Sequence, residues 1–199
     1  MLQALAKLIL KVGGWEIAGE LPAAKRAVVI AAPHTSNWDG FWALVYKVAV
    51  QLDIHFFAKQ SLFWFPLNVL LRALGGIPLD RKRAGSAVDQ AIEMFRENDS
   101  YYFGLAPEGT RSRADHWKSG FYRIARGAEV PVVLGLLDYG KRRIGIGPTL
   151  ELSSDWEKDL AFCREFYKDI QGRWPDKAGP VTFAGDPQAE TRRKKKATR

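Results

Sequence analysis

The segment "RAVVIAAPHTSNWD", residues 26–39, runs from an apolar stretch directly into a histidine and a carboxylate. Residues 28–32 have the composition of a buried β-strand, because Val and Ile favour strands. His34 and Asp39 follow at the end of this strand. A loop that leaves a rigid strand holds its side chains in fixed places, and such loops are where binding and catalysis concentrate. The segment therefore predicts a strand of a sheet with functional side chains at its end.

Apolar segments typical of strands and of helices alternate along the rest of the chain. Strands are expected over residues 15–20, 27–32, 54–59, 75–80, 101–107, 130–137 and 142–148, and helices over residues 2–12, 40–51, 62–74, 86–98, 119–127 and 155–174. Ser86 with Asp89, and Ser154 with Glu157, have the spacing of capping boxes that begin two of these helices. The alternation predicts a single α/β domain, with a mixed, mostly parallel sheet flanked by helices and an N-terminal amphipathic helix.

Two segments carry more apolar surface than an ordinary surface helix. In residues 2–12, Gln3, Lys7 and Lys11 form one polar stripe and the other positions are mostly apolar, so residues 1–14 predict an amphipathic helix. Residues 61–74, "SLFWFPLNVLLRAL", are apolar nearly all round. Each segment either packs on the core of the domain or faces a membrane interface, where amphipathic helices and Trp side chains settle.

The net charge of +8 comes mostly from the C-terminal end of the chain. Residues 191–199, "TRRKKKATR", hold six of the 30 Lys and Arg residues and no acid, which leaves 24 basic against 22 acidic residues. This balance argues against a nucleic-acid partner. We expect residues 15–185 to form the globular domain and residues 186–199 to form a basic tail, which is either simply disordered or attracted to an anionic membrane surface.

Cysteine content and hydropathy limit the cellular setting. Cys163 is the single cysteine, so no internal disulfide can form, and its helical pattern predicts core packing. No run of 18 uncharged apolar residues is present, and the N-terminus lacks the pattern of a secretory signal. A site in a reducing compartment, on the cytoplasmic face of a membrane and without a spanning helix, is the expectation.

The pair His34 and Asp39 suggests proton transfer. A neutral imidazole, with an ordinary pKa of about 6.5, accepts a proton from a hydroxyl, and a carboxylate on its other nitrogen fixes the tautomer. No G-x-S-x-G motif is present, so the pair has no serine nucleophile of its own and suits activation of a hydroxyl on a substrate. The alternative is structural, with His34 hydrogen-bonded in place and Asp39 serving as a helix cap.

Two further strand ends carry cationic residues. "APEGTRSR", residues 106–113, places Gly109 and Arg111 after a strand, and "GGIPLDRKR", residues 75–83, places Arg81 after another. Glycine allows close approach of the backbone to a ligand, and the guanidinium fork of arginine matches phosphate oxygens. In open α/β sheets, ligands bind at the edge formed by the carboxyl ends of the strands.

The four segments "PHTSNWD", "GGIPLDRKR", "APEGTRSR" and "VPVVLG" resemble, in order and spacing, the four sequence blocks of the glycerophospholipid acyltransferases, which include the 1-acylglycerol-3-phosphate acyltransferases. The resemblance implies a glycerol-3-phosphate acyltransferase-like fold. It implies that His34 is the general base, with Asp39 as its orienting partner. It places Val130 and Pro131 on the acyl-donor side. The acceptor-binding residues that it implies are Arg81, Glu108, Gly109, Thr110 and Arg111.

The implied reaction moves a fatty acyl group from an acyl thioester, on coenzyme A or on acyl carrier protein, to the hydroxyl of a lysophospholipid such as 1-acylglycerol-3-phosphate. No cofactor besides this co-substrate and no metal is expected, since the histidines show no metal-ligand spacing. Two departures from the family pattern, Pro33 before the histidine and Leu134–Gly135 in place of a second proline, bear on the identity of the acceptor. A non-catalytic lipid-binding module and a thioesterase using the same pair are the alternatives.

Overall fold

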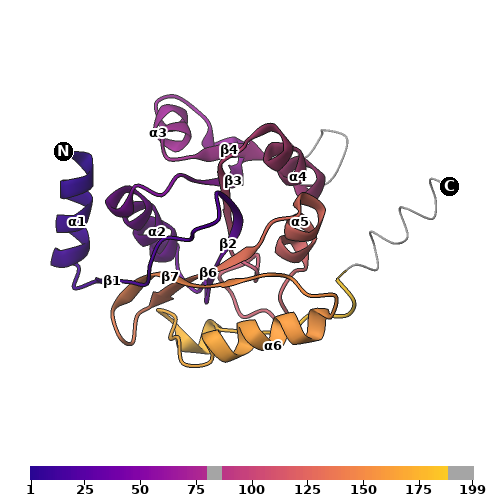
Figure 1. Cartoon of the computed structure of the whole chain (residues 1–199). Coiled ribbons are helices and arrows are strands. Elements are labelled where there is room, and N and C mark those ends of the chain that lie inside the picture. Colours follow the sequence, from indigo (N-terminus) through magenta and orange to yellow (C-terminus); the bar gives the residue numbers. More distant parts are fainter. Residues whose placement is uncertain (80–86, 188–199) are drawn as a thin grey trace.

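The computed structural model of the chain describes residues 1–79 and 87–187, and Figure 1 shows how its elements are arranged. The strands are β1 (Glu16–Ala18), β2 (Arg26–Ala32), β3 (Ile54–Lys59), β4 (Gly76–Leu79), β5 (Tyr101–Leu105), β6 (Val132–Asp138) and β7 (Arg143–Leu150). The helices are α1 (Leu2–Val12), α2 (Asn37–Val50), α3 (Leu67–Ala73), α4 (Ala87–Glu97), α5 (Gly120–Ala128) and α6 (Trp156–Tyr167), with short 3-10 helices at Gln60–Leu62 and Pro175–Lys177.

The described strands form one seven-stranded sheet in the order β1-β7-β6-β2-β5-β3-β4. All neighbouring pairs are parallel except β6 and β7, which are antiparallel. Because β6, β2 and β5 are adjacent and parallel, their carboxyl ends meet at the same edge of the sheet. The predicted single α/β domain with a mostly parallel sheet is confirmed.

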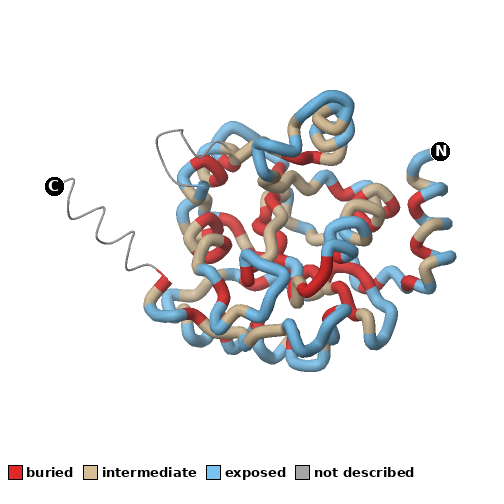
Figure 2. The backbone as a smooth tube through the Cα atoms, turned by 180° about the vertical axis from the view of Figure 1, so that it is seen from behind, coloured by how far each residue is buried: buried red, intermediate tan, exposed pale blue. Residues whose placement is uncertain are grey.

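Helices cover both faces of this sheet, and the side chains of its strands alternate between two cores. Val28 and Ile30 of β2 belong to a core that includes buried residues of α4, α5 and α6. Ala27 and Val29 of the same strand belong to a core that includes buried residues of α1 and α2. The central strands are accordingly largely red in Figure 2. Cys163 is buried in the first of these cores, and burial raises the pKa of its thiol to about 12, which fits the predicted packing role.

The helix α1 packs on the domain by a narrow stripe only. Ala6 and Leu10 are buried against the α2 side, and the side-chain amide of Gln3 donates a hydrogen bond to the carbonyl oxygen of Ala49 at 3.2 Å. A second apolar stripe lies on the outside of the helix and is exposed; it consists of Leu2, Leu5, Leu8 and Val12. Core packing and an outward apolar face therefore occur together on this helix.

The apolar segment 61–74 is not the central core helix that its composition allowed. Pro66, which lacks a backbone N–H, precedes the seven-residue helix α3, and none of the helical residues is buried. Trp64, Phe65, Val69 and Leu70 are more than half exposed. Both α1 and α3 lie away from α6, and much of each is pale blue in Figure 2. Within the described residues, no helix is long and apolar enough to cross a membrane.

Helix boundaries differ from the sequence-based prediction where capping decides them. α6 begins after Asp155, whose carboxylate accepts hydrogen bonds from the backbone N–H groups of Glu157 and Lys158, so the predicted capping box of Ser154 and Glu157 is wrong. The helix also ends at Tyr167 rather than near residue 174. The other predicted cap, Ser86, lies outside the described residues.

Candidate active site

The loop after β2 is held by a capping box at the start of α2. Ser36 is the N-cap, and its hydroxyl accepts a hydrogen bond from the N–H of Trp38. Asp39, the third helical residue, accepts hydrogen bonds through Oδ2 from the N–H groups of Thr35 and Ser36, each at 2.8 Å. This motif begins α2 at Asn37, earlier than the predicted Gly40, and it turns the carboxylate back toward the loop.

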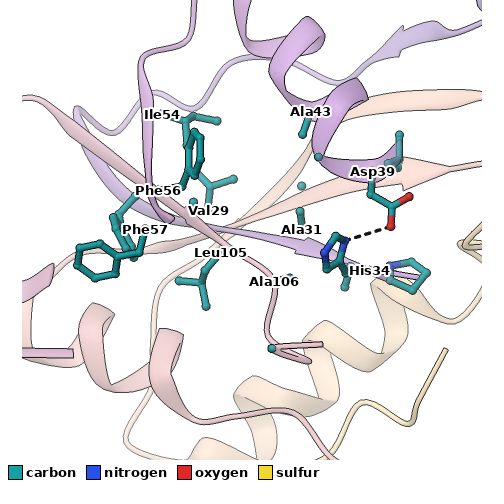
Figure 3. A pocket seen from close by; sticks show the side chains of 18 of the residues that line it. Val29, Ala31, His34, Asp39, Ala43, Ile54, Phe56, Phe57, Leu105 and Ala106 are labelled. Carbon is teal, nitrogen blue, oxygen red and sulfur yellow. Dashed lines mark hydrogen bonds and ion pairs between the residues drawn. The ribbon is translucent and has the colours of Figure 1, made fainter. Parts of the chain in front are cut away.

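The same oxygen of Asp39 lies 3.1 Å from Nδ1 of His34, and the dashed line in Figure 3 joins the two residues. A carboxylate can only accept a hydrogen bond, so in the neutral ring Nδ1 carries the proton and Nε2 keeps a free lone pair. The His34 side chain is about 25% exposed, whereas that of Asp39 is buried. The carboxylate caps the helix, as the structural interpretation expects, and it also holds the ring of His34. The functional interpretation of the pair stays a prediction.

Hydrogen bonding keeps Asp39 ionised although it is buried. Burial raises the pKa of this carboxyl group, but the hydrogen bonds from His34, Ser36, Tyr139 and Thr35 outweigh burial and lower the pKa below its ordinary value of 3.8. An ionised Asp39 can stabilise positive charge on the imidazole as His34 takes up a proton.

Glu108 lies behind the His34 loop rather than at its surface. It is only 5% exposed, and its Oε1 accepts a hydrogen bond from the backbone N–H of His34 at 3.0 Å. Among the described residues, no hydrogen-bond partner reaches its buried Oε2. Burial raises the pKa of Glu108 above its ordinary value of 4.5, against the hydrogen bonds that it accepts. In this position Glu108 supports the backbone of the His34 loop. The contact with the acceptor that the resemblance implies stays a prediction.

A cavity of about 960 Å³ lies beside His34 and is lined by residues of α2, α4 and α5 as well as by the strands between them. Its walls are mostly apolar; among them are Val29, Ala31, Ala43, Ile54, Phe56 and Phe57. Small-molecule sites typically have volumes of roughly 300–1,000 Å³. Ala31 is exposed although it lies in a central strand, because its side chain faces this space. The arrangement places a proton acceptor at one end of a long apolar chamber.

The residues predicted to bind the acceptor are only partly brought to this cavity. Gly109, Thr110 and Arg111 line it, at the carboxyl end of β5 next to β2. Glu108 is not among the lining residues. Arg81 lies outside the described residues. Val130 and Pro131 precede β6, at the opposite end of that strand from His34.

Three residues near the site were not singled out from the sequence. Lys118 lines the cavity, and its side chain crosses Gly109, where a Cβ atom would come within 2.8 Å of it; the left-handed φ of +63° also favours glycine there. Tyr139 lies beside Asp39, with its hydroxyl 2.8 Å from Oδ1, and the Arg173 guanidinium lies 5.8 Å from the centre of the Tyr139 ring. Lys118 begins the segment "KSGFYRIA", residues 118–125, and lies outside the four sequence blocks quoted above. The sequence signal for Tyr139 was only its position after a strand.

Comparison with known proteins agrees with this geometry. Residues 15–133, more than half of the chain, match the family model described as Acyltransferase. The chain belongs to the acyltransferase family. This confirms the family predicted from the four sequence blocks. The match includes the His34 loop and the 106–113 segment, and it ends within β6, before Tyr139.

The fold of this acyltransferase also resembles a solved structure, that of the 1-acyl-sn-glycerophosphate (LPA) acyltransferase PlsC from Thermotoga maritima. The TM-score is 0.60 and the sequence identity is 21%, over 87% of this chain and 79% of the other. A comparison with curated proteins gave no match. Among the residues that the structure describes, no group of three or more His, Cys, Asp and Glu side chains could hold a metal ion.

Replacing Glu108 with Gln should change how stability depends on pH. Because the folded-state pKa of Glu108 is raised, its contribution to stability is fully present below about pH 4.5 and is lost as pH rises through the folded-state value. Gln keeps the shape and the acceptor for the His34 N–H but does not ionise. The free energy of unfolding of the wild type, relative to Glu108→Gln, should therefore fall as pH rises above about 4.5, which denaturant titrations at a series of pH values would measure.

Glu97→Gln, at an exposed position of α4, is the control and should give a pH dependence parallel to that of the wild type. Parallel curves for Glu108→Gln as well would show that Glu108 is not the buried titrating group described here.

Proposed function

We propose that this acyltransferase moves a fatty acyl group from an acyl thioester to the free hydroxyl of a lysophospholipid such as 1-acylglycerol-3-phosphate. The observation that carries the proposal is the His34–Asp39 pair, which stands at one end of an apolar cavity with cationic side chains beside it. The fold it shares with a 1-acyl-sn-glycerophosphate acyltransferase supports the choice of acceptor.

In the proposed reaction, Nε2 of His34 takes the proton from the acceptor hydroxyl as the oxygen attacks the thioester carbon. Asp39, bonded to Nδ1, stabilises the imidazolium that forms. The carbon–sulfur bond then breaks, and the departing thiolate receives the proton from the imidazolium. The products are the acylated phospholipid and the free thiol, and His34 returns to its neutral form.

The cationic residues at the cavity suit the phosphate of the acceptor. Arg111 and Lys118 both line the cavity that His34 also lines. Gly109 has no side chain, which leaves room for the Lys118 side chain to pass over it. An arginine fork and a lysine ammonium bind phosphate oxygens well. Thr110 lines the same wall, and Arg81 is proposed to add a further cation on sequence grounds.

The apolar cavity suits the long acyl chain. Asp39, Ala43 and Lys47 lie on one stripe of α2, four residues apart, and all three line the cavity. At a rise of about 1.5 Å per residue, Ala43 is about 6 Å and Lys47 about 12 Å along the helix from Asp39. Each buried methylene group contributes about 0.8 kcal/mol, so a chamber of this length favours long chains.

Peripheral attachment to the cytoplasmic face of an anionic membrane completes the proposal. The exposed apolar stripe of α1 and the exposed Trp64 and Phe65 before α3 are surfaces of the kind that enter a lipid interface. Lys7 and Lys11 flank the stripe on α1 and would meet anionic headgroups. Coenzyme A and acyl carrier protein are both proposed as carriers of the donor.

His34→Ala should abolish acceptor-dependent thiol release from a long-chain acyl-coenzyme A, measured in mixed vesicles with and without 1-acylglycerol-3-phosphate. Loss of the general base should lower kcat by roughly 10²–10⁴-fold. His55→Gln is the control, because His55 stacks on Tyr101 at the amino end of β3 and should keep the wild-type rate.

Other outcomes of this assay would favour the alternatives. Thiol release that does not need the acceptor, yet is lost in His34→Ala, would identify a thioesterase. If wild type and His34→Ala were equally inactive with acyl-coenzyme A, acyl carrier protein and a series of lysolipids, the proposal would be overturned in favour of a non-catalytic lipid-binding module.

Ala43→Phe should shorten the acyl chain that the enzyme accepts, because the larger ring fills the middle of the cavity. We expect kcat/KM for palmitoyl thioesters to fall at least about tenfold more than that for octanoyl thioesters, which corresponds to about 1.4 kcal/mol of lost binding. Ala161→Phe, on the exposed side of α6, should leave this ratio unchanged. An unchanged ratio in Ala43→Phe would remove the acyl chain from this cavity.

Leu5→Ser combined with Leu8→Ser should weaken sedimentation with anionic vesicles by at least about tenfold, since burial of each leucine contributes roughly 1.5–3 kcal/mol. Substitution is preferable to deletion of α1, because Leu10 of this helix is part of the core. Phe162→Ser changes an exposed aromatic residue on α6 and should have no effect. Equal sedimentation of all variants would refute docking through α1.

A further inference from the structure

Tyr139 reaches Asp39 from a part of the chain that neither the sequence blocks nor the family match includes. β6 is the parallel neighbour of β2, and Tyr139 follows its last residue, so the ring stands beside the His34 loop. Its hydroxyl donates a hydrogen bond of 2.8 Å to Oδ1 of Asp39. The other oxygen, Oδ2, receives His34 and the two backbone N–H groups of the loop.

We infer that Tyr139 is a positioning residue for acyl transfer. It holds the Asp39 carboxylate in place, so that His34 keeps the orientation and the tautomer in which Nε2 can take the proton from the substrate hydroxyl. The inference rests on the function proposed above. With one donor on Oδ1 and three on Oδ2, the carboxylate cannot turn away from the imidazole without breaking hydrogen bonds. A carboxylate that could rotate would leave the ring free to adopt the other tautomer.

Tyr139 is itself held from three sides. The ring packs edge to face on Trp15, with ring centroids 4.9 Å apart, and the Arg173 guanidinium lies over the ring. Its backbone N–H donates to the carbonyl oxygen of Gln171 at 2.8 Å. These contacts come from the segments after α1 and after α6. They hold the ring in place, while the hydroxyl donates its hydrogen bond to Asp39 and interacts with the Arg173 side chain.

The charged surroundings determine what the hydroxyl can do. Burial and the neighbouring Asp39 raise the pKa of Tyr139, and Arg173 acts in the opposite direction. The phenol therefore stays protonated and can donate a hydrogen bond to Asp39. Glu108 faces His34 from the β5 side. Beneath the loop, the buried hydroxyl of Tyr167 donates to the carbonyl oxygens of Ile30 and Gly135. Tyr139 is therefore the side chain that reaches Oδ1 of Asp39 within the described residues.

The chain contains a matched arrangement away from the site. The hydroxyl of Tyr122 donates to Oδ2 of Asp159 at 2.9 Å, and the Arg126 guanidinium lies 5.5 Å from the Tyr122 ring. This second Arg–Tyr–Asp group joins α5 to α6 and contacts neither His34 nor Asp39. Tyr122→Phe thus removes the same kind of hydrogen bond without touching the candidate active site.

The test compares Tyr139→Phe with Tyr122→Phe in the full-length protein, using the thiol-release assay. Tyr139→Phe should lower kcat about tenfold with KM values within about twofold, because the hydrogen bond to a charged group is lost but no substrate contact is. The acid limb of its pH–rate profile should move to higher pH, since a carboxylate with one donor fewer stabilises the imidazolium more. Tyr122→Phe should change neither quantity.

A second measurement does not depend on activity. Nitrogen-15 NMR of the histidine rings, assigned with His34→Ala, reports the tautomer of His34 and the pH midpoint of its signals. Tyr139→Phe should reduce the share of the Nδ1–H tautomer and move the midpoint upward, even if no thioester is turned over. Failure of the proposed function would therefore appear as an inactive wild type, whereas failure of this inference would appear as unchanged ring signals.

Incorporation of 4-aminophenylalanine at position 139 restores a donor at the same place and guards against a folding defect. This variant should recover the rate to within about threefold of the wild type and return the acid limb to its original position. If Tyr139→Phe behaves as Tyr122→Phe does in kcat, in the pH profile and in the ring signals, Tyr139 is a packing residue only and the inference is overturned.

Discussion

The Asp39 carboxylate connects three separate parts of the chain through the hydrogen bonds it accepts. Its Oδ2 takes two backbone N–H groups of the loop after β2, which begins α2 and sets the direction of that helix. The same atom orients His34, and Oδ1 binds Tyr139 at the end of β6. Helix capping and orientation of the imidazole therefore use the same charge, and neither can be changed without changing the other.

The sheet explains why these groups meet. Three adjacent parallel strands end at one edge, and a residue of the site follows each of them. His34 follows β2, Glu108 follows β5 and Tyr139 follows β6. Glu108 holds the backbone of the loop and Tyr139 holds the carboxylate. The position of His34 thus follows from strand pairing, which is far less variable than the conformation of a free loop.

The succession of strands and helices along the chain could be predicted from the sequence, because apolar and amphipathic segments alternate in an α/β domain. The sequence also singled out His34, Asp39 and Arg111, because these polar residues come shortly after apolar strands, and all three line the cavity. It did not foresee Tyr139, since a tyrosine after an apolar strand carries no motif and its role depends on β6 pairing with β2. It misplaced the cap of α6 by one residue, because Ser154 and Asp155 are both good N-caps and only the backbone geometry distinguishes them. The exposure of Trp64, Phe65, Val69 and Leu70 was one of two alternatives that the sequence left open, and it depends on the edge position of β4, which the sequence does not give.

Ala31 occupies the middle of the sheet, where a large aliphatic residue would normally add to the core, and instead it faces the cavity. Part of the cavity lies between α2 and the strands, beside the core on that side, and in the proposed reaction the acyl chain of the substrate fills it. During each turnover a fatty acyl chain would take the place of core side chains, packed between α2 and the strands as they would be. Recognition of the donor and completion of the hydrophobic core are then one event, and release of the acylated product reopens the core.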